Sequence, residues 1–188
     1  MILGSKSPRR QELLKLICND FEVKTIDVDE SVDVYSSVKE YANKIATKKI
    51  NAYVNHFGKD EIIICADTIV ALGDTILEKP KNKEHCYEMI KNLQNNFHIV
   101  YTTVAISYYG KIKKFMEKTI VYVDEMTESE INEYIQTEEP YDKAGGYGIQ
   151  GIFSKYISKI SGDYYNVMGL PVSRLFKELK KLKKASSN

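Results

Sequence analysis

The sequence predicts an α/β fold built on a mixed β-sheet. Segments with the apolar pattern of strands alternate along the chain with segments whose apolar residues recur at helical spacing. Two strand-like segments, 98–107 and 115–124, are separated by a short turn at Gly110, as in an antiparallel pair. Because one connection is a hairpin, the pattern excludes a purely parallel sheet.

The first part of the chain supplies strands and helices in turn. Ile2–Gly4 predicts a short strand, and Pro8 stands where a helix can begin. Residues 21–28 predict a second strand, and the spacing of apolar residues predicts an amphipathic helix over 39–57. The near-continuous apolar run at 61–66 is typical of a strand buried on both faces.

The second part continues this alternation. A helix is expected at 84–94, ahead of the strand pair, and another from Thr127 through Gln136, where Thr127 and Glu130 form a capping-box pattern. Residues 152–160 alternate as a strand does, and Pro171 opens a last helix. We expect one domain over residues 1–182 and a frayed tail over 183–188.

Composition narrows the class of protein. A length of 188 residues suffices for one core or two small lobes. The net charge of +1 excludes a generally basic nucleic-acid coat. No signal peptide or membrane-spanning run is recognisable, and the three cysteines form no CxxC pair. These features predict a cytoplasmic protein without a disulfide framework or a thiolate zinc site.

Ser5–Arg10, with the sequence Ser-Lys-Ser-Pro-Arg-Arg, follows the first strand and opens the first helix. Free N–H groups at a helix start and two arginines next to hydroxyls could bind an anion such as phosphate. The alternative is an exposed basic first turn in which Ser7 caps the helix.

Four further polar clusters lie at the ends of predicted strands or in loops. Asp67, after the most apolar strand, is a candidate base or metal ligand, or else a turn-former. Lys79 could provide a point cation, although a solvated surface lysine is the commoner case. The acidic stretch 27–30 could donate a carboxylate to a metal, or end a strand in solvent. The glycines of Asp142–Gly151 allow close approach of a ligand, but the segment is neither a Walker A loop nor a GxGxxG motif.

Taken in order, these clusters resemble the Maf family of nucleoside triphosphate pyrophosphatases over nearly the whole chain. The motifs that carry the resemblance are Ser5–Arg10, Glu30, Ala46–Lys49, Ala66–Thr68, Lys79–Pro80, Asp142–Gly151 and Gly162–Pro171. Leu93–His98 departs from the family pattern, because it lacks a Ser-Gly turn and keeps only the histidine.

The resemblance implies a fold like that of inosine triphosphate pyrophosphatases, of the Maf/Ham1 type. That fold is an elongated mixed sheet flanked by helices, with two lobes and a central cleft. It also implies metal-dependent hydrolysis of a nucleoside triphosphate, between the α and β phosphates, with Mg²⁺ or Mn²⁺ as the divalent cation. A homodimer and a link to septum formation are implied by the resemblance alone. Ala-Asp-Thr at 66–68 is similar to the branch that acts on dTTP and UTP.

Site roles follow from the same resemblance. Residues expected to bind phosphate are Ser7, Arg9, Arg10, Lys49 and Lys79. Glu30 and Asp67 are expected to hold the metal, with Asp67 also the catalytic base. Residues expected to contact the base or set specificity are Arg9, Thr68, Tyr147 and Gln150.

Three alternatives stay open from the sequence. The chain could bind a nucleotide as a regulator of cell division with little turnover. It could act on 7-methyl-GTP, as another branch of the family does. It could bind nucleic acid through its basic segments, although the near-zero net charge argues against this. No membrane partner is expected, because no apolar run approaches the length of a membrane span.

Overall fold

In the computed structural model, which describes residues 1–186, seven strands form one mixed sheet. The strands are β1 (Ile2–Gly4), β2 (Glu22–Val23), β3 (Ile62–Leu72), β4 (Thr75–Leu77), β5 (Asn96–Tyr108), β6 (Lys111–Val123) and β7 (Ile157–Ser161). Their order is β2-β1-β3-β5-β6-β7, and β4 pairs with β3. Strand β1 runs parallel to β2 and β3, whereas the β3–β4 and β6–β7 pairs are antiparallel. The predicted mixed α/β class is therefore confirmed.

The chain divides into two compact units. Unit 1 comprises Met1–Asp67, Thr102–Glu117 and the chain from Gly169, and unit 2 comprises Thr68–Tyr101 and Lys118–Met168. The long strands β3, β5 and β6 each contribute one half to each unit.

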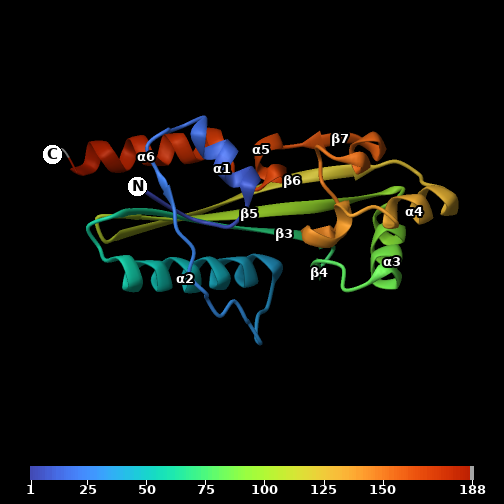
Figure 1. Ribbon diagram of the computed structural model, residues 1–188, viewed down its shortest axis with the longest axis horizontal. Coiled ribbons are helices and arrows are strands. Elements are labelled where there is room, and N and C mark those ends of the chain that lie inside the picture. The colour runs from blue at the N-terminus through green and yellow to red at the C-terminus, as the bar shows by residue number, and fades with distance from the viewer. Residues whose placement is uncertain (187–188) are drawn as a thin grey trace. The chain divides into compact units, whose positions relative to one another are not determined.

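Unit 1 contains three helices, α1 (Pro8–Lys15), α2 (Val38–Phe57) and α6 (Val172–Ser186). In Figure 1, α2 lies on one side of the unit 1 strands, and α1 and α6 lie on the other. The Ser37 side chain caps α2 by accepting a hydrogen bond from the Glu40 backbone N–H. The core between α2 and the strands consists of Ile2, Ala46, Ile50, Tyr53, Val54, Ile63, Cys65 and Ala105. Burial of this apolar stripe is what stabilises so long a helix.

Two strands of unit 1 differ in length from those expected. Strand β2 covers only Glu22–Val23, because after the bond from the Lys24 N–H to the Leu3 carbonyl the next backbone groups are held by the Tyr53 hydroxyl instead of by a ladder. That hydroxyl donates to the Lys24 carbonyl at 3.1 Å and accepts from the Ile26 N–H at 3.3 Å. The expected end of a strand at Ala66 is wrong, since β3 continues to Leu72. Its β-branched residues after Asp67 extend the strand.

Unit 2 has its own core. Helices α3 (Lys83–Leu93) and α4 (Glu128–Ile135) pack together, and a short helix α5 (Tyr164–Met168) follows β7. Three 3₁₀ turns, η1 (Glu139–Asp142), η2 (Ala144–Gly146) and η3 (Ile152–Tyr156), carry the chain between α4 and β7. The core contains Val70, Cys86, Ile90, Leu93, Val100, Val121, Val123, Met126, Ile131, Tyr134, Ile135, Tyr147, Phe153 and Tyr156.

Local signals identified most helices correctly. The capping box at Thr127 and Glu130 is present at the start of α4, as predicted. Residues 152–156 form η3 instead of a strand, so the pattern expected over 152–160 holds only from Ile157. Helix α6 continues through Ser186, so residues 183–186 of the expected frayed tail are helical, and 187–188 lie outside the described residues. Within the described part of the chain, no helix combines the length and the apolar character needed to cross a membrane.

Candidate functional site

The centre of the unit 1 site is a lysine held between two carboxylates. Lys49 of α2 places its Nζ 2.8 Å from Glu30 Oε1 and 3.3 Å from Asp67 Oδ1. The side chains of Lys49 and Asp67 are only 14 % and 18 % exposed. Asp67 therefore brings a largely buried negative charge into the middle of β3. That position is tolerable because Lys49 compensates the charge.

The periodicity of α2 explains why Lys49 reaches this place while its neighbour does not. Ala46 and Ile50 are buried on the apolar face of the helix, and Lys49 lies at the edge of that face. Lys48 points to solvent and donates to Asp29 Oδ2 at 3.3 Å and to the Ser31 carbonyl at 2.5 Å. The two adjacent lysines thus fix the acidic loop at consecutive carboxylates.

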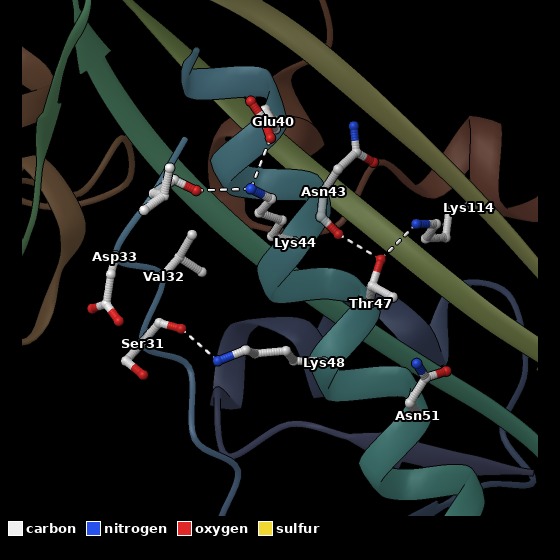
Figure 2. A pocket seen from close by; sticks show the side chains of 11 residues that line it. Ser31, Val32, Asp33, Glu40, Asn43, Lys44, Thr47, Lys48, Asn51 and Lys114 are labelled. Carbon is white, nitrogen blue, oxygen red and sulfur yellow. Dashed lines mark hydrogen bonds and ion pairs between the residues drawn. The ribbon is translucent and has the colours of Figure 1, made fainter. Parts of the chain in front are cut away.

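Lys48 also lines an open groove of about 600 Å³ along the outer face of α2 (Figure 2). The groove is lined by Ser31, Val32, Asp33, Val34, Glu40, Asn43, Lys44, Thr47, Lys48, Asn51 and Lys114. Each of its lysines donates to the protein: Lys48 to Ser31, Lys44 to Glu40 and the Val34 carbonyl, and Lys114 to Thr47. Two of these lysines, Lys44 and Lys48, bind the loop that carries Glu30. Because all three lysines already have acceptors, we do not assign a phosphate site to this groove.

Two arginines at the start of α1 have different surroundings. Arg10 donates through Nε to the Gly169 carbonyl at 2.9 Å and through one terminal nitrogen to Ser5 Oγ at 3.3 Å. Burial lowers the pKa of the Arg10 guanidinium, and the negative charge of Asp67 opposes this shift. Arg9 is half-buried, and within residues 1–186 no hydrogen bond or ion pair occupies its guanidinium.

Ser7 stands at the N-cap position of α1, as the structural alternative proposed, but its side chain makes no cap hydrogen bond. Its backbone N–H donates to Ser5 Oγ at 3.2 Å, and its carbonyl accepts from the Gln11 N–H at 3.3 Å. Pro8 follows as the first helical residue and has no N–H of its own. The first turn of α1 therefore presents backbone donors and a hydroxyl that the helix itself does not use.

Three cations, on Arg9, Arg10 and Lys49, accompany two carboxylates, on Glu30 and Asp67. This excess of positive charge suits a polyanionic ligand. Cys65 adds no nucleophile, because burial raises the pKa of its thiol to about 12 and leaves it protonated at neutral pH.

The same carboxylates fit a divalent cation. Glu30 and Asp67 both reach a single Nζ, so their oxygens converge on one region. Among the described residues, no group of three or more histidine, cysteine or acidic side chains could hold a metal alone. Mg²⁺ and similar ions are commonly held by one or two carboxylates together with substrate phosphates, and this pair matches that habit.

In unit 2, the segment rich in glycine packs against the Lys79–Pro80 step. The Gly145 N–H donates to the Glu78 carbonyl at 3.2 Å, and a Cβ on Gly146 would lie only 3.1 Å from Pro80 Cγ. Gly145 has a φ of +72°, and a Cβ there would meet Val70 of β3 at 2.8 Å. The structure therefore brings together the Lys-Pro step, the glycine segment and the part of β3 that follows Thr68. Lys79 is exposed and Thr68 is half-buried.

Tyr147 lies in the core of unit 2, although the sequence predicted it to face a base. Its side chain is 5 % exposed, and its hydroxyl lies 2.6 Å from His98 Nε2. Phe153 packs against the Tyr147 ring. This burial leaves little of Tyr147 available to a ligand and makes it an anchor beneath the loop that carries Gln150. Gln150 itself is exposed.

Sequence reasoning missed Glu139, which organises that loop. Its carboxylate accepts from the backbone N–H groups of Ile152 at 2.5 Å, Phe153 at 3.3 Å and Gly148 at 3.4 Å. The one feature of the sequence that could have indicated this role is the position of an acidic residue shortly before the glycine-rich segment. Bonds that span 9 to 14 residues leave no periodic trace in the sequence.

The motif Gly162–Pro171 also has an internal role. Asn166 is fully buried and donates to the Val100 carbonyl at 3.1 Å and to Thr119 Oγ1 at 3.0 Å. Thr119 in turn donates to the Asp163 carbonyl at 2.8 Å. These bonds fasten α5 to β5 and β6 within unit 2.

Comparisons with known proteins agree with the motifs. A sequence model of the family described as Maf-like protein matches residues 1–182. A Bacillus cereus protein named dTTP/UTP pyrophosphatase is 46 % identical over 180 residues, which cover 96 % of this chain and 94 % of the relative. A Bacillus anthracis protein of the same name gives the same identity and coverage. Among solved structures, the Ham1 protein of Staphylococcus aureus aligns with 83 % of this chain and 78 % of its own, at 16 % identity and a TM-score of 0.46.

The burial of His98 predicts a pH-dependent stability. Burial lowers the pKa of His98 from 6.5 to about 4, so protons bind the unfolded chain first as the pH falls. The contribution of the neutral His98 side chain to the unfolding free energy is fully present above about pH 6.5 and is lost as the pH falls toward 4. Between pH 7 and pH 4, the unfolding free energy of the wild type should fall by about 3 kcal/mol more than that of His98→Gln, measured by urea titration. The exposed His56→Gln is the control for removing an imidazole, and parallel curves for wild type and His98→Gln would contradict the prediction.

Proposed function

The chain belongs to the Maf-like protein family, and on that premise we propose that it hydrolyses dTTP and UTP to the nucleoside monophosphate and pyrophosphate. The observation that carries the proposal is Lys49 held between Glu30 and Asp67, with Arg10 near the same two carboxylates and Arg9 next to Arg10. Relatives named dTTP/UTP pyrophosphatase, which align with 96 % of the chain, support the choice of substrate.

Phosphate binding is assigned to the cations and to the start of α1. Arg9 has no acceptor among the described residues and offers paired N–H donors that match phosphate oxygens. Arg10 and Lys49 add charge beside Asp67, and the Ser7 hydroxyl adds a donor. Lys79, exposed and without an acceptor among the described residues, is a further candidate for a phosphate oxygen.

Glu30 and Asp67 would hold the divalent cation, either Mg²⁺ or Mn²⁺. When bound, that cation neutralises phosphate charge and acts as a Lewis acid. The negative charge that develops on the leaving pyrophosphate is also met by the arginines and Lys49, which are already in place before substrate binds.

Asp67 is proposed to be the catalytic base. A water oxygen attacks the α phosphorus, and the bond from that phosphorus to the oxygen bridging the α and β phosphates breaks. The electron pair of this bond leaves with pyrophosphate, and the Asp67 carboxylate takes a proton from the water. Lys49 holds the Asp67 carboxylate in position through the 3.3 Å contact.

Recognition of the base is assigned to Thr68 and Gln150. A pyrimidine such as uracil presents an acceptor at O4 and a donor at N3, and a glutamine amide can satisfy both. Arg9 is proposed to take part in substrate choice as well as in phosphate binding. Tyr147 is assigned to support of the loop that carries Gln150, because its ring is buried.

Replacement of Asp67 tests the proposed reaction. Asp67→Asn should lower the rate of pyrophosphate release from dTTP and UTP by about 10³-fold, because a positioned base is removed. Release would be measured with Mg²⁺ or Mn²⁺ over dTTP, UTP, CTP, 5-methyl-UTP, dITP, GTP and 7-methyl-GTP. Asp74→Asn, at an exposed turn, is the matched control.

Each other outcome of this panel has a defined meaning. Release from 7-methyl-GTP alone would keep the reaction and overturn the pyrimidine specificity. Tight binding of a nucleotide that is returned intact would replace the enzyme by a nucleotide-binding regulator. An Asp67→Asn variant with the wild-type rate would remove Asp67 from the reaction.

The two arginines predict different consequences on substitution. Arg9→Ala should raise KM by about tenfold or more without a change in the melting temperature, since the side chain makes no bond within the described residues. Arg10→Ala should reduce activity and also destabilise the fold by about 1–3 kcal/mol, because it removes the side-chain donor of the Gly169 carbonyl and one of the two donors to Ser5 Oγ. Steady-state kinetics and thermal unfolding of both variants test this, and equal loss of stability in the two would contradict it.

A further inference from the structure

The loop Gly148–Phe153 is organised around one carboxylate of unit 2. Glu139 Oε2 accepts from the Ile152 N–H at 2.5 Å, and Oε1 accepts from the N–H groups of Phe153 at 3.3 Å and Gly148 at 3.4 Å. The Tyr134 hydroxyl is a donor to two acceptors, Glu139 Oε1 at 3.2 Å and the Gly146 carbonyl at 2.9 Å. A single side chain therefore satisfies backbone donors on both flanks of Gln150.

The close approach at Gly151 shows how tightly this carboxylate is enclosed. A Cβ at Gly151 would collide with the carboxylate of Glu139. The backbone there has a φ of −97°, which alanine adopts freely, so conformational preference does not explain the glycine. The space beside Gly151 is occupied by the Glu139 carboxylate itself.

The loop is also fixed from below by apolar contacts. Tyr147 and Phe153 are buried and stack at 4.9 Å between ring centroids, and they flank the exposed residue Gln150 in sequence. With both ends buried and the intervening N–H groups on one acceptor, the backbone of Gln150 has little freedom.

We propose that Glu139 is a positioning residue for base recognition, which holds the Gly148–Phe153 loop so that Gln150 is presented to the pyrimidine ring. This inference rests on the proposed function, since it assigns the readout of Gln150 to a nucleotide base. A carboxylate is required because every partner of Glu139 in the loop is a donor, and a carboxylate accepts at both oxygens. An amide of the same shape would turn one NH₂ group toward those donors.

The kinetic test compares Glu139→Gln with Glu138→Gln, an exposed neighbour outside the hydrogen-bond set. Glu139→Gln should lower kcat/KM for UTP by about 10- to 100-fold, mainly through KM, because a misplaced contact residue weakens binding more than chemistry. Its preference for UTP over CTP should fall, whereas the shape of the pH–rate profile should not change. Glu139→Asp, which keeps the charge, should recover part of the preference.

Gly151→Ala provides a variant that leaves Glu139 in the chain. It should reproduce the kinetic phenotype of Glu139→Gln, because the added methyl group displaces the carboxylate. The double variant Glu139→Ala with Gly151→Ala should be no worse than either single variant, since the two act on one contact. Additive losses would overturn the proposal.

Amide hydrogen exchange gives a readout that needs no turnover. In Glu139→Gln, the peptide that contains Ile152 and Phe153 should exchange about tenfold faster, which corresponds to loss of one hydrogen bond, and Glu138→Gln should not change it. Unchanged exchange would overturn the role of Glu139 whatever the activity. Faster exchange with an unchanged UTP preference would overturn the link to base recognition. If the wild type hydrolyses no nucleotide, the proposed function fails, and the link to base recognition fails with it.

Discussion

The negative charge of Asp67 in the middle of β3 is the constraint on which the unit 1 site depends. A carboxylate that is 18 % exposed inside an apolar strand is costly unless a partner compensates it. Lys49 provides that compensation, and α2 has to place Lys49 at the edge of its buried face to do so. The positions of α2, β3 and the acidic loop are thereby linked, since Glu30 contacts the same Lys49 ammonium group. The packing of α2 and the chemistry of the site cannot be altered independently.

Local signals predicted much of the fold, and contacts between distant segments set the rest. The capping box at Thr127 and the hairpin at Gly110 depend on a few neighbouring residues, so the sequence displays them directly. The turn at Gly110 follows Tyr109 with positive φ at both residues, as a two-residue hairpin requires. Strand β2 is short because Tyr53, about thirty residues away, takes the backbone groups that a longer ladder would use. No periodicity within 21–28 carries that information.

The same division applies to the site. Motif order indicated Glu30, Lys49 and Asp67, and in the structure both carboxylates contact the Lys49 ammonium group. The pattern could not tell which residues of the glycine segment face inward. Tyr147 was expected to face a base on the strength of the family resemblance, but it fills the core beside His98. Glu139 escaped notice because its bonds are to backbone N–H groups, which every residue type supplies.

The structure separates residues that build the site from residues that remain available to a ligand. Arg10 donates to the Gly169 carbonyl and to Ser5 Oγ, and so connects the start of α1 to the turn before α6. Arg9, one position earlier, makes no such bond within residues 1–186. Adjacent side chains on a helix point about 100° apart, so two consecutive arginines can have different surroundings. Lys48 and Lys49 repeat the arrangement on α2, where one lysine fastens the acidic loop and the other meets the buried carboxylate. In both helices the adjacent cations therefore have different partners: Arg10 and Lys48 bond to backbone carbonyls of other segments, whereas Lys49 meets two carboxylates and Arg9 makes no bond within residues 1–186.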